Sequence, residues 1–311
     1  MKLKKIFSFI FILVVLGAWI FYSFKYIDDI SSSFKKINII LFLFASLFLI
    51  GVYFIIIFNW KYILKVMGFT ITYLKASRIW FLSNLAKYIP GTIWVPLGRS
   101  IYTSDENISV PKTFLSWIIE IYLTLFSIVF FVSVIQFWYS YPISIWKGWP
   151  FLILFIFILP IFLNRYIISL IVFLSGRKRF KKFKNKFVYL QELFRKTKLR
   201  KLMLPFSLNI VIYLLYGIWL FFLAKSVNPL VRFSFFFYVF IWIVSWFVSY
   251  VVVFLPGGIG LREGILVLFL INNGFIMGDA IVISILTRIQ YIIVDGLLGL
   301  AFLKDRKINI S

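Results

Sequence analysis

The residues in this sequence that could bind or polarise a ligand are charged side chains set within long apolar stretches. These side chains are Lys87, Arg99, Glu120, Arg262, Glu263, Arg288 and Asp295. A charge at the centre of a lipid bilayer costs roughly 3 kcal/mol or more, so such residues usually face a cavity or pair with one another. We expect ion pairs such as Arg262 with Glu120. Arg288 and Asp295 lie seven residues apart and therefore share one face of a helix.

Each of these charges also has a purely structural interpretation. Arg288 and Asp295 fit a salt bridge between packed helices as well as they fit a role in binding. Lys87 and Arg99 have long side chains that can extend to the membrane surface. The polar and aromatic side chains expected to line a shared cavity with them are Asn84, Tyr88, Trp94 and Gln290. For the tryptophan, a place in the aromatic belt at the membrane surface is the favoured alternative.

The chemistry open to such a site is limited, because the sequence contains no cysteine and no histidine. This composition excludes disulfides, thiolate nucleophiles, imidazole bases and the usual zinc ligands. Carboxylates, amines, guanidinium groups, hydroxyls and the backbone remain. We therefore predict a binding site with no catalytic residue, no metal and no cofactor.

Two segments rich in proline and glycine hold several of these residues. Segment 79–99 reads IWFLSNLAKYIPGTIWVPLGR, and segment 254–274 reads FLPGGIGLREGILVLFLINNG. The stretch from Ile79 to Ile89 would give about 16 Å of helix, half the thickness of the hydrocarbon core, before Pro90 interrupts it. We predict two re-entrant broken helices. The shared string Pro-Gly-x-Ile suggests a weak internal repeat, a pattern known from transporters.

Unwound backbone within a bilayer predicts a cavity, because its N–H and C=O groups need protein or water as partners. A glycine-rich turn that opens a helix also presents N–H groups and a positive dipole end to phosphate. Arg262 lies in such a first turn. The alternative is that the prolines and glycines kink helices at a packing contact.

The elements that position these residues are predicted to be membrane-spanning helices. Hydrophobic residues make up 63% of the 311, mean hydropathy is +1.02, and 14% are charged, where a soluble domain has about a quarter. A span needs roughly 20 apolar residues. The spans predicted on this basis are Ile6 to Phe24, Asn38 to Phe58, Thr113 to Trp138, Pro150 to Leu174, Met203 to Leu223, Val231 to Leu255 and Gly278 to Leu303. We predict one all-α polytopic membrane domain over residues 1–311, with about seven or eight spans.

The opening MKLKK and the apolar run after it resemble a signal peptide. The run is long, however, and it ends in Tyr22, Phe24 and Lys25 where a cleavage site would have small residues. We expect a retained first helix.

The formal charge of +24 is concentrated in a connector between two halves of the chain, residues 177–201, which holds twelve basic residues and one acid, Glu192. The positive-inside rule places this connector and the basic N-terminus in the cytoplasm. Phe180, Phe183, Phe187, Leu190 and Phe194 recur at helical spacing, which favours an in-plane helix on an anionic leaflet. A solvated loop that only sets orientation is the alternative, and neither interpretation implies nucleic acid.

The strings SNLAKYIPGTIWVPLGR, SWIIE, LPGGIGLREG and LTRIQYIIVDGLLGL resemble landmarks of the lysylphosphatidylglycerol synthase transmembrane family, also described as flippase-like or UPF0104 proteins. The resemblance covers nearly the whole chain. It implies a membrane unit that moves a modified lipid between leaflets, while a separate soluble domain makes that lipid from aminoacyl-tRNA. The sequence up to Ser311 holds no such domain, so the transferase activity is not expected.

The predicted substrate-binding residues combine the family pattern with the charge analysis. They are Asn84, Lys87, Tyr88, Pro90, Gly91, Trp94, Arg99, Glu120, Pro256, Gly257, Gly258, Gly260, Arg262, Glu263, Arg288 and Asp295. The leading hypothesis is a plasma-membrane protein of envelope or glycolipid biogenesis that binds or translocates an anionic phospholipid or lipid-linked sugar. Arg99, Arg262 and Lys87 would hold its phosphate.

Two other functions stay open. One is an integral-membrane glycosyltransferase that uses a polyprenyl-phosphate sugar, for which Asp28 and Asp29 would be the acids of the first external loop. Short external loops argue against it. The other is a non-transporting accessory subunit of a glycolipid-assembly complex, with a glycosyltransferase or lipid synthase as partner.

Overall fold

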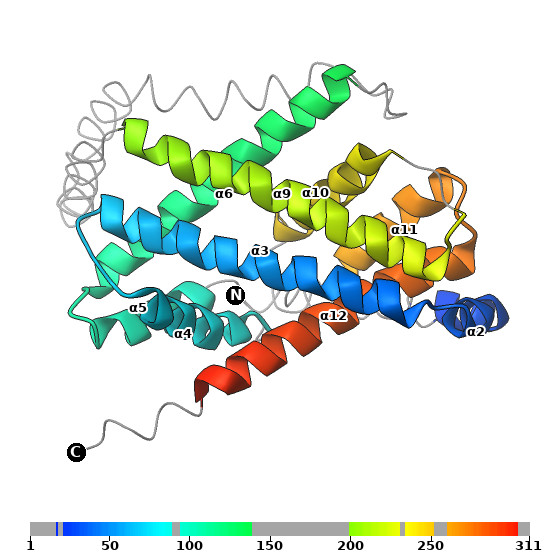
Figure 1. The fold of residues 1–311 in the computed structure, drawn as a ribbon, viewed down its shortest axis with the longest axis horizontal. Coiled ribbons are helices and arrows are strands. Elements are labelled where there is room, and N and C mark those ends of the chain that lie inside the picture. Colours follow the sequence, from blue (N-terminus) through cyan, green and yellow to red (C-terminus); the bar gives the residue numbers. More distant parts are fainter. Residues whose placement is uncertain are drawn as a thin grey trace, which may run out of the picture.

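The computed structural model describes residues 17, 21–88, 94–138, 199–230, 234–251 and 260–303, and the elements in these ranges are helical (Figure 1). They are α2 (Ile27–Lys35), α3 (Ile39–Val66), α4 (Tyr73–Asn84), the 3-10 helix η1 (Leu85–Tyr88), α5 (Trp94–Ser104), α6 (Val110–Trp138), α9 (Leu199–Val227), α10 (Phe235–Val251), α11 (Leu261–Asn272) and α12 (Met277–Leu303). The all-α fold class is confirmed.

Four of these helices are long and apolar enough to cross a membrane: Ile39–Val66, Val110–Ile135, Arg200–Val227 and Met277–Phe302. They confirm four of the predicted spans. A fifth prediction, residues 231–255, corresponds to the shorter apolar helix α10. The predicted span 150–174, most of the span 6–24 and most of the basic connector lie outside the described residues.

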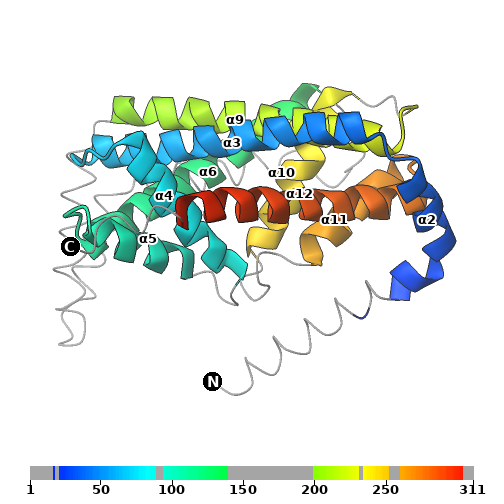
Figure 2. The ribbon, with the colours of Figure 1, turned by 60° about the horizontal axis from the view of Figure 1, so that its bottom comes forward.

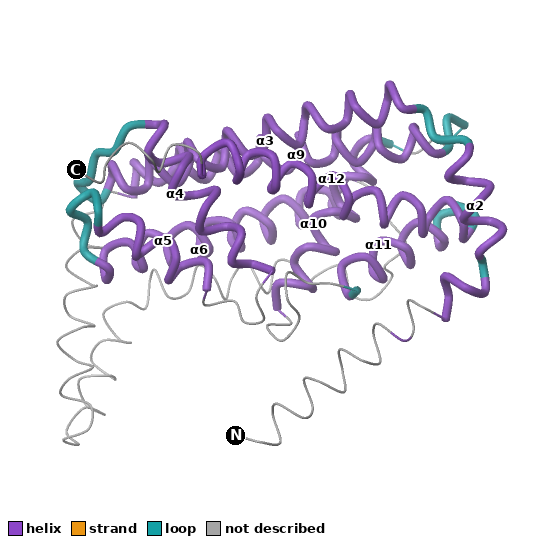
Figure 3. The backbone as a smooth tube through the Cα atoms, turned by 90° about the horizontal axis from the view of Figure 1, so that it is seen from below, coloured by secondary structure: helices purple, strands orange, loops and turns teal. Residues whose placement is uncertain are grey.

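The long helices pack against the short ones: α4 contacts α3 and α12, α10 contacts α9, and α11 contacts α12. Helices α3 and α9 pack side by side along their length, and α12 lies beneath them (Figure 2). The short helices pair in sequence order, α4 with α5 and α10 with α11. The first pair lies toward one end of α12 and the second toward the other, near α2 (Figure 3).

Short helices were expected beside the Pro-Gly segments, and α4, α5 and α11 have 12, 11 and 12 residues. Each is about 18 Å long or less, well short of a bilayer core. The predicted breaking residues themselves, Pro90, Gly91, Pro256, Gly257 and Gly258, lie outside the described residues. Gly260 directly before α11 has φ +84°, a conformation that favours glycine.

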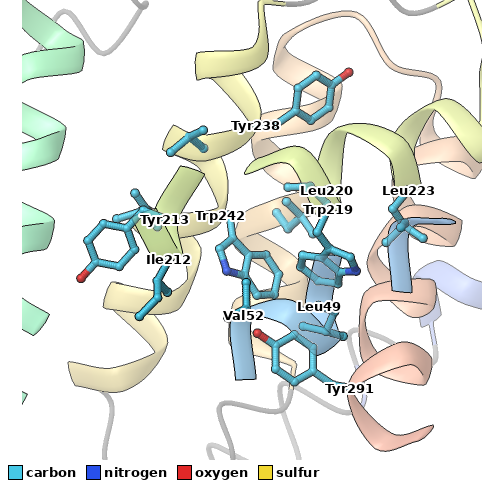
Figure 4. Packing of buried hydrophobic residues seen from close by; sticks show 14 of the residues in the cluster. Leu49, Val52, Ile212, Tyr213, Trp219, Leu220, Leu223, Tyr238, Trp242 and Tyr291 are labelled. Carbon is cyan, nitrogen blue, oxygen red and sulfur yellow. The ribbon is translucent and has the colours of Figure 1, made fainter. Parts of the chain in front are cut away.

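The core of the helical bundle is rich in aromatic side chains. Trp219, Trp242 and Tyr291 point toward one another from α9, α10 and α12 (Figure 4). The ring centroids of Trp219 and Trp242 are 4.5 Å apart in an edge-to-face arrangement, which suits the ring quadrupoles. A close approach of α9 to α10 holds this group together: a Cβ built on Gly217 would lie 2.1 Å from Val239 Cγ2.

Candidate anion-binding cavity

A cavity of about 330 Å³ lies inside the helical bundle. Every described element from α3 onward contributes to its lining, whereas α2 does not. This volume is within the range of small-molecule sites, about 300–1,000 Å³.

The charges that face this cavity are mostly positive. Lys87, Arg99, Arg262 and Arg288 line it, and Glu120 is the one carboxylate among the described lining residues. These four cations come from η1, α5, α11 and α12. The other two carboxylates predicted for the site, Glu263 and Asp295, lie behind the cations as their counter-ions.

Asp295 receives hydrogen bonds from three parts of the fold. Its Oδ2 is 2.6 Å from Lys87 Nζ and accepts from the Tyr88 hydroxyl at 2.7 Å. Its Oδ1 accepts from the Tyr53 hydroxyl at 2.8 Å and from Asn84 Nδ2 at 3.1 Å. These charge-assisted bonds tie α3, α4 and η1 to α12 and hold Lys87 at the cavity wall.

Glu263 organises the beginning of α11. Its Oε2 accepts from the Gly260 backbone N–H at 2.7 Å, which caps the helix. Its Oε1 accepts from Arg262 Nη2 at 3.0 Å and lies 3.5 Å from Arg288 Nη1. The Arg262 guanidinium also lies over the rings of Trp242 and Tyr291, at 5.1 Å and 5.0 Å.

The expected pair of Arg262 with Glu120 is therefore wrong. The Glu263 carboxylate accepts from the Gly260 N–H at the start of α11, and the Arg262 guanidinium donates to the same carboxylate. Glu120 instead forms an ion pair with Arg99, which joins α6 to α5. Arg288 and Asp295, predicted to share a helix face, each pair with a different element.

Arg99 does not extend to the membrane surface, since it is 4% exposed. Its guanidinium lies 4.9 Å from the ring of Trp60 and 5.9 Å from that of Trp80. Its Nε has no hydrogen-bond partner in the part of the chain that the structure describes. Lys87 also turns inward and contacts Asp295.

The charged groups of the site do not cancel. Four cations against three carboxylates, Glu120, Glu263 and Asp295, leave one positive charge in a buried cluster. An uncompensated charge in a low-dielectric interior is costly, so the cluster favours one bound anion.

The remaining predicted residues are placed as follows. Asn84 and Tyr88 line the cavity, whereas Trp94 begins α5 and is 44% exposed. Gln290, which is buried, accepts from Trp219 Nε1 and donates to the Phe42 carbonyl. Asp28 and Asp29 lie exposed in the first turn of α2, outside the cavity lining.

Several lining residues were not predicted from the sequence, chiefly amides and aromatic side chains. They include Tyr53, Asn59, Trp80, Asn209, Tyr216, Trp242 and Tyr291. Asn59 and Asn209 carried a usable signal, because an amide within an apolar span is itself unusual and needs a partner. The aromatic side chains gave none, since tryptophan and tyrosine are also expected at the membrane surface.

Comparison with known proteins gives one result that covers most of the chain. The model of the family described as "Lysylphosphatidylglycerol synthase TM region" matches residues 6–299. No curated protein matches the chain.

Proposed function

Because the chain belongs to the lysylphosphatidylglycerol synthase transmembrane family, we propose that it binds an anionic lipid headgroup in its cavity and moves that lipid between membrane leaflets. The family membership and the apolar helices establish a membrane protein with a role connected to lipid. The anionic ligand and the translocation are the proposal, and the plasma membrane is its expected location.

The observation that carries the proposal is the convergence of four cations on one cavity, with one carboxylate facing it. Three of the four are arginines, whose planar guanidinium groups bind phosphate through paired hydrogen bonds. Arg262 is suited to phosphate in a second way, because it lies in the first turn of α11. The positive end of a helix dipole favours an anion at that place.

Translocation is supported by the kind of helix that surrounds the cavity. The α4–α5 and α10–α11 pairs contain three helices too short to cross a bilayer core. Broken helices that meet around a polar site are typical of transporters, in which the substrate leaves water within the membrane. A headgroup in this cavity would exchange its water for guanidinium and hydroxyl groups.

A binding and transport role is favoured over glycosyl transfer. The matching family model describes a membrane region and no catalytic domain. The candidate acids of a glycosyltransferase, Asp28 and Asp29, are exposed on α2, which contributes nothing to the described cavity lining.

The test is lipid scrambling by the purified protein in liposomes, with fluorescent phosphatidylglycerol as the probe. We expect movement by the wild type and a loss of about tenfold or more in Arg262→Gln, since a charge-assisted hydrogen bond to phosphate is worth about 1.5–3 kcal/mol. Glu263 keeps Arg288 and the Gly260 N–H in this variant, so the fold should persist.

The matched control is Lys75→Gln, which removes a cation from an ion pair with Glu106 in which Lys75 is 54% exposed. Surface pairs contribute little, so its scrambling rate should equal that of the wild type. Equal rates for Arg262→Gln and the wild type would count against the cavity as the site. No movement by the wild type would favour the accessory role.

A further inference from the structure

Glu120 needs an explanation of its own, because a carboxylate that faces an anion-binding cavity repels phosphate. It lies on α6, lines the cavity, and its side chain is 15% exposed. Arg99 is its hydrogen-bond donor in the described part of the chain. A carboxylate has about four acceptor positions, so most of those on Glu120 are open to a ligand.

A second acceptor with an open position belongs to Asn59, which lines the same cavity. Asn59 is 4% exposed, and its Nδ2 donates to Asn209 Oδ1 at 3.0 Å and to the Pro205 carbonyl at 3.4 Å. A carbonyl oxygen can only accept, which fixes the orientation of the Asn59 amide. Asn59 Oδ1 is then a buried acceptor without a partner among the described residues. Such an acceptor destabilises a protein unless a ligand or water donates to it.

A headgroup that satisfies these two acceptors must donate hydrogen bonds. An ionised phosphodiester has no proton to donate, so the donors are hydroxyl or ammonium groups elsewhere in the headgroup. The charge of the cluster decides between them. A phosphate with hydroxyl groups brings the net charge from +1 to zero, whereas a lysyl-modified phosphatidylglycerol, with one phosphate and two ammonium groups, brings it to +2.

Aromatic rings beside Glu120 indicate the shape of the hydroxylated group. Trp117 on α6 and Trp246 and Tyr250 on α10 line the cavity, and α10 packs against α6. The rings of Trp246 and Tyr250 are stacked, with centroids 5.0 Å apart and 12° between their planes. A six-membered ring with hydroxyl substituents stacks its C–H face on such a surface and directs its hydroxyl groups to the rim. Glycerol has no such face.

We infer that the headgroup is a hydroxylated six-membered ring joined to its lipid through one phosphate. The ring lies against Trp246 with its hydroxyl groups at Glu120 and Asn59, and the phosphate lies toward Arg262. This inference rests on the proposed function. Two lipids share this chemistry, a sugar on a polyprenyl phosphate and an inositol phospholipid.

The experiment compares scrambling of four labelled lipids by the full-length protein in liposomes: phosphatidylglycerol, lysyl-phosphatidylglycerol, phosphatidylinositol and a glucosyl-phosphoryl polyprenol. We expect at least one ring lipid to move about tenfold faster than phosphatidylglycerol, the size of one aromatic contact. The faster of the two ring lipids identifies the source. Trp246→Ala should remove this preference by slowing the ring lipids about tenfold relative to phosphatidylglycerol, while Trp246→Phe, which keeps an aromatic face, preserves it.

A second variant on another helix protects the test against misfolding of the first: Trp117→Ala should lose the same preference, and Trp117→Phe should keep it. Equal rates for ring lipids and phosphatidylglycerol would overturn the inference and leave the proposed function standing. A preference for the lysyl lipid, or alanine variants that slow all lipids equally, would overturn it in the same way. Movement of none of the four lipids rejects the proposed function and this inference with it.

Discussion

At the scale of single residues, the site is defined by carboxylates that serve as fixed counter-ions. Asp295 is 2% exposed and accepts from an ammonium, two phenols and an amide. Its oxygens are saturated by these donors, so a ligand meets Lys87 rather than Asp295. Its contribution is therefore positional, because it holds a cation at the wall of an apolar bundle.

Asp295→Asn should destabilise the protein by about 3–5 kcal/mol, because it leaves Lys87 buried without its counter-ion. Thermal unfolding in detergent measures the loss. Asp29→Asn, which changes an exposed carboxylate of α2, is the matched control and should leave the melting temperature in place.

The double variant Lys87→Met, Asp295→Asn separates the effect of the unpaired charge from the effect of the lost hydrogen bonds to Asp295. It should recover much of the stability, since neither charge is then left alone. A melting temperature as low as that of Asp295→Asn would show that the hydrogen bonds to Tyr53, Asn84 and Tyr88 dominate.

The charged residues of the site could be predicted from the sequence, but their partners could not. Lys87, Arg99 and Arg262 stood out because a charge in an apolar stretch is expensive. Their partners depend on which helices lie together, and hydropathy carries no such information. Arg262 shows the consequence, since its carboxylate is the next residue in the chain and not the distant Glu120.

At the scale of elements, the positions of the helices follow from close contacts at small residues. Gly217 on α9 lets α10 approach so closely that Val239 occupies the place of a side chain. This contact holds Trp242 against Trp219 and so shapes the platform beneath Arg262.

Gly217→Ala should therefore push α10 away from α9. Overpacking of this kind costs about 1–3 kcal/mol, and thermal unfolding should show it. Gly51→Ala on α3 is the control, because nothing lies within 4 Å of its added Cβ. That control should be neutral or slightly stabilising, as alanine is the better helix former. Equal melting temperatures for the two variants would mean that α9 and α10 tolerate a wider spacing.

The lengths of the apolar runs predicted the positions of the spanning helices well. They predicted the ends of these helices poorly. The predicted span 38–58 continues as α3 to Val66, through Asn59, Trp60 and Lys61. These residues lower the hydropathy, yet the backbone hydrogen bonds continue and Trp60 is fully buried. Helix ends depend on packing and capping, which a window of hydropathy does not measure.

At the scale of the whole molecule, the fold surrounds a cavity that holds a charged cluster with an apolar exterior. Large apolar side chains are exposed along α3 and α12, among them Leu47 at 62% and Leu297 at 64%. Lipid is the solvent for such surfaces, which is why composition alone predicted the fold class. The arrangement of the helices around the cavity was beyond it, since many arrangements bury the same apolar area.

This contrast predicts a pattern of chemical labelling, for which the natural sequence is suited because it contains no cysteine. Thr124→Cys places a thiol in the cavity, and Leu47→Cys places one on the apolar exterior. The thiolate attacks such reagents, and a thiol ionises readily only where water reaches it. We expect Thr124→Cys to react with a water-soluble methanethiosulfonate and Leu47→Cys to stay unmodified.

The charge of the thiol reagent also tests the sign of the charge in the cavity. The net positive cluster should make a sulfonate-bearing reagent react severalfold faster at Thr124→Cys than a trimethylammonium reagent, and salt should reduce the difference. A faster reaction with the cation would contradict the anionic character of the ligand.

The bonds to Asp295 also constrain how the protein is made. Tyr53 and Tyr88 reach this carboxylate across 242 and 207 residues of chain, and Lys87 depends on the same partner. During synthesis α3, α4 and η1 leave the ribosome long before α12. Until the last long helix inserts, the Lys87 ammonium must lie at the membrane surface or against another protein. Insertion of α4 and η1 is therefore a late, cooperative step, and a nascent chain arrested before α12 should leave Lys87 accessible from the aqueous side.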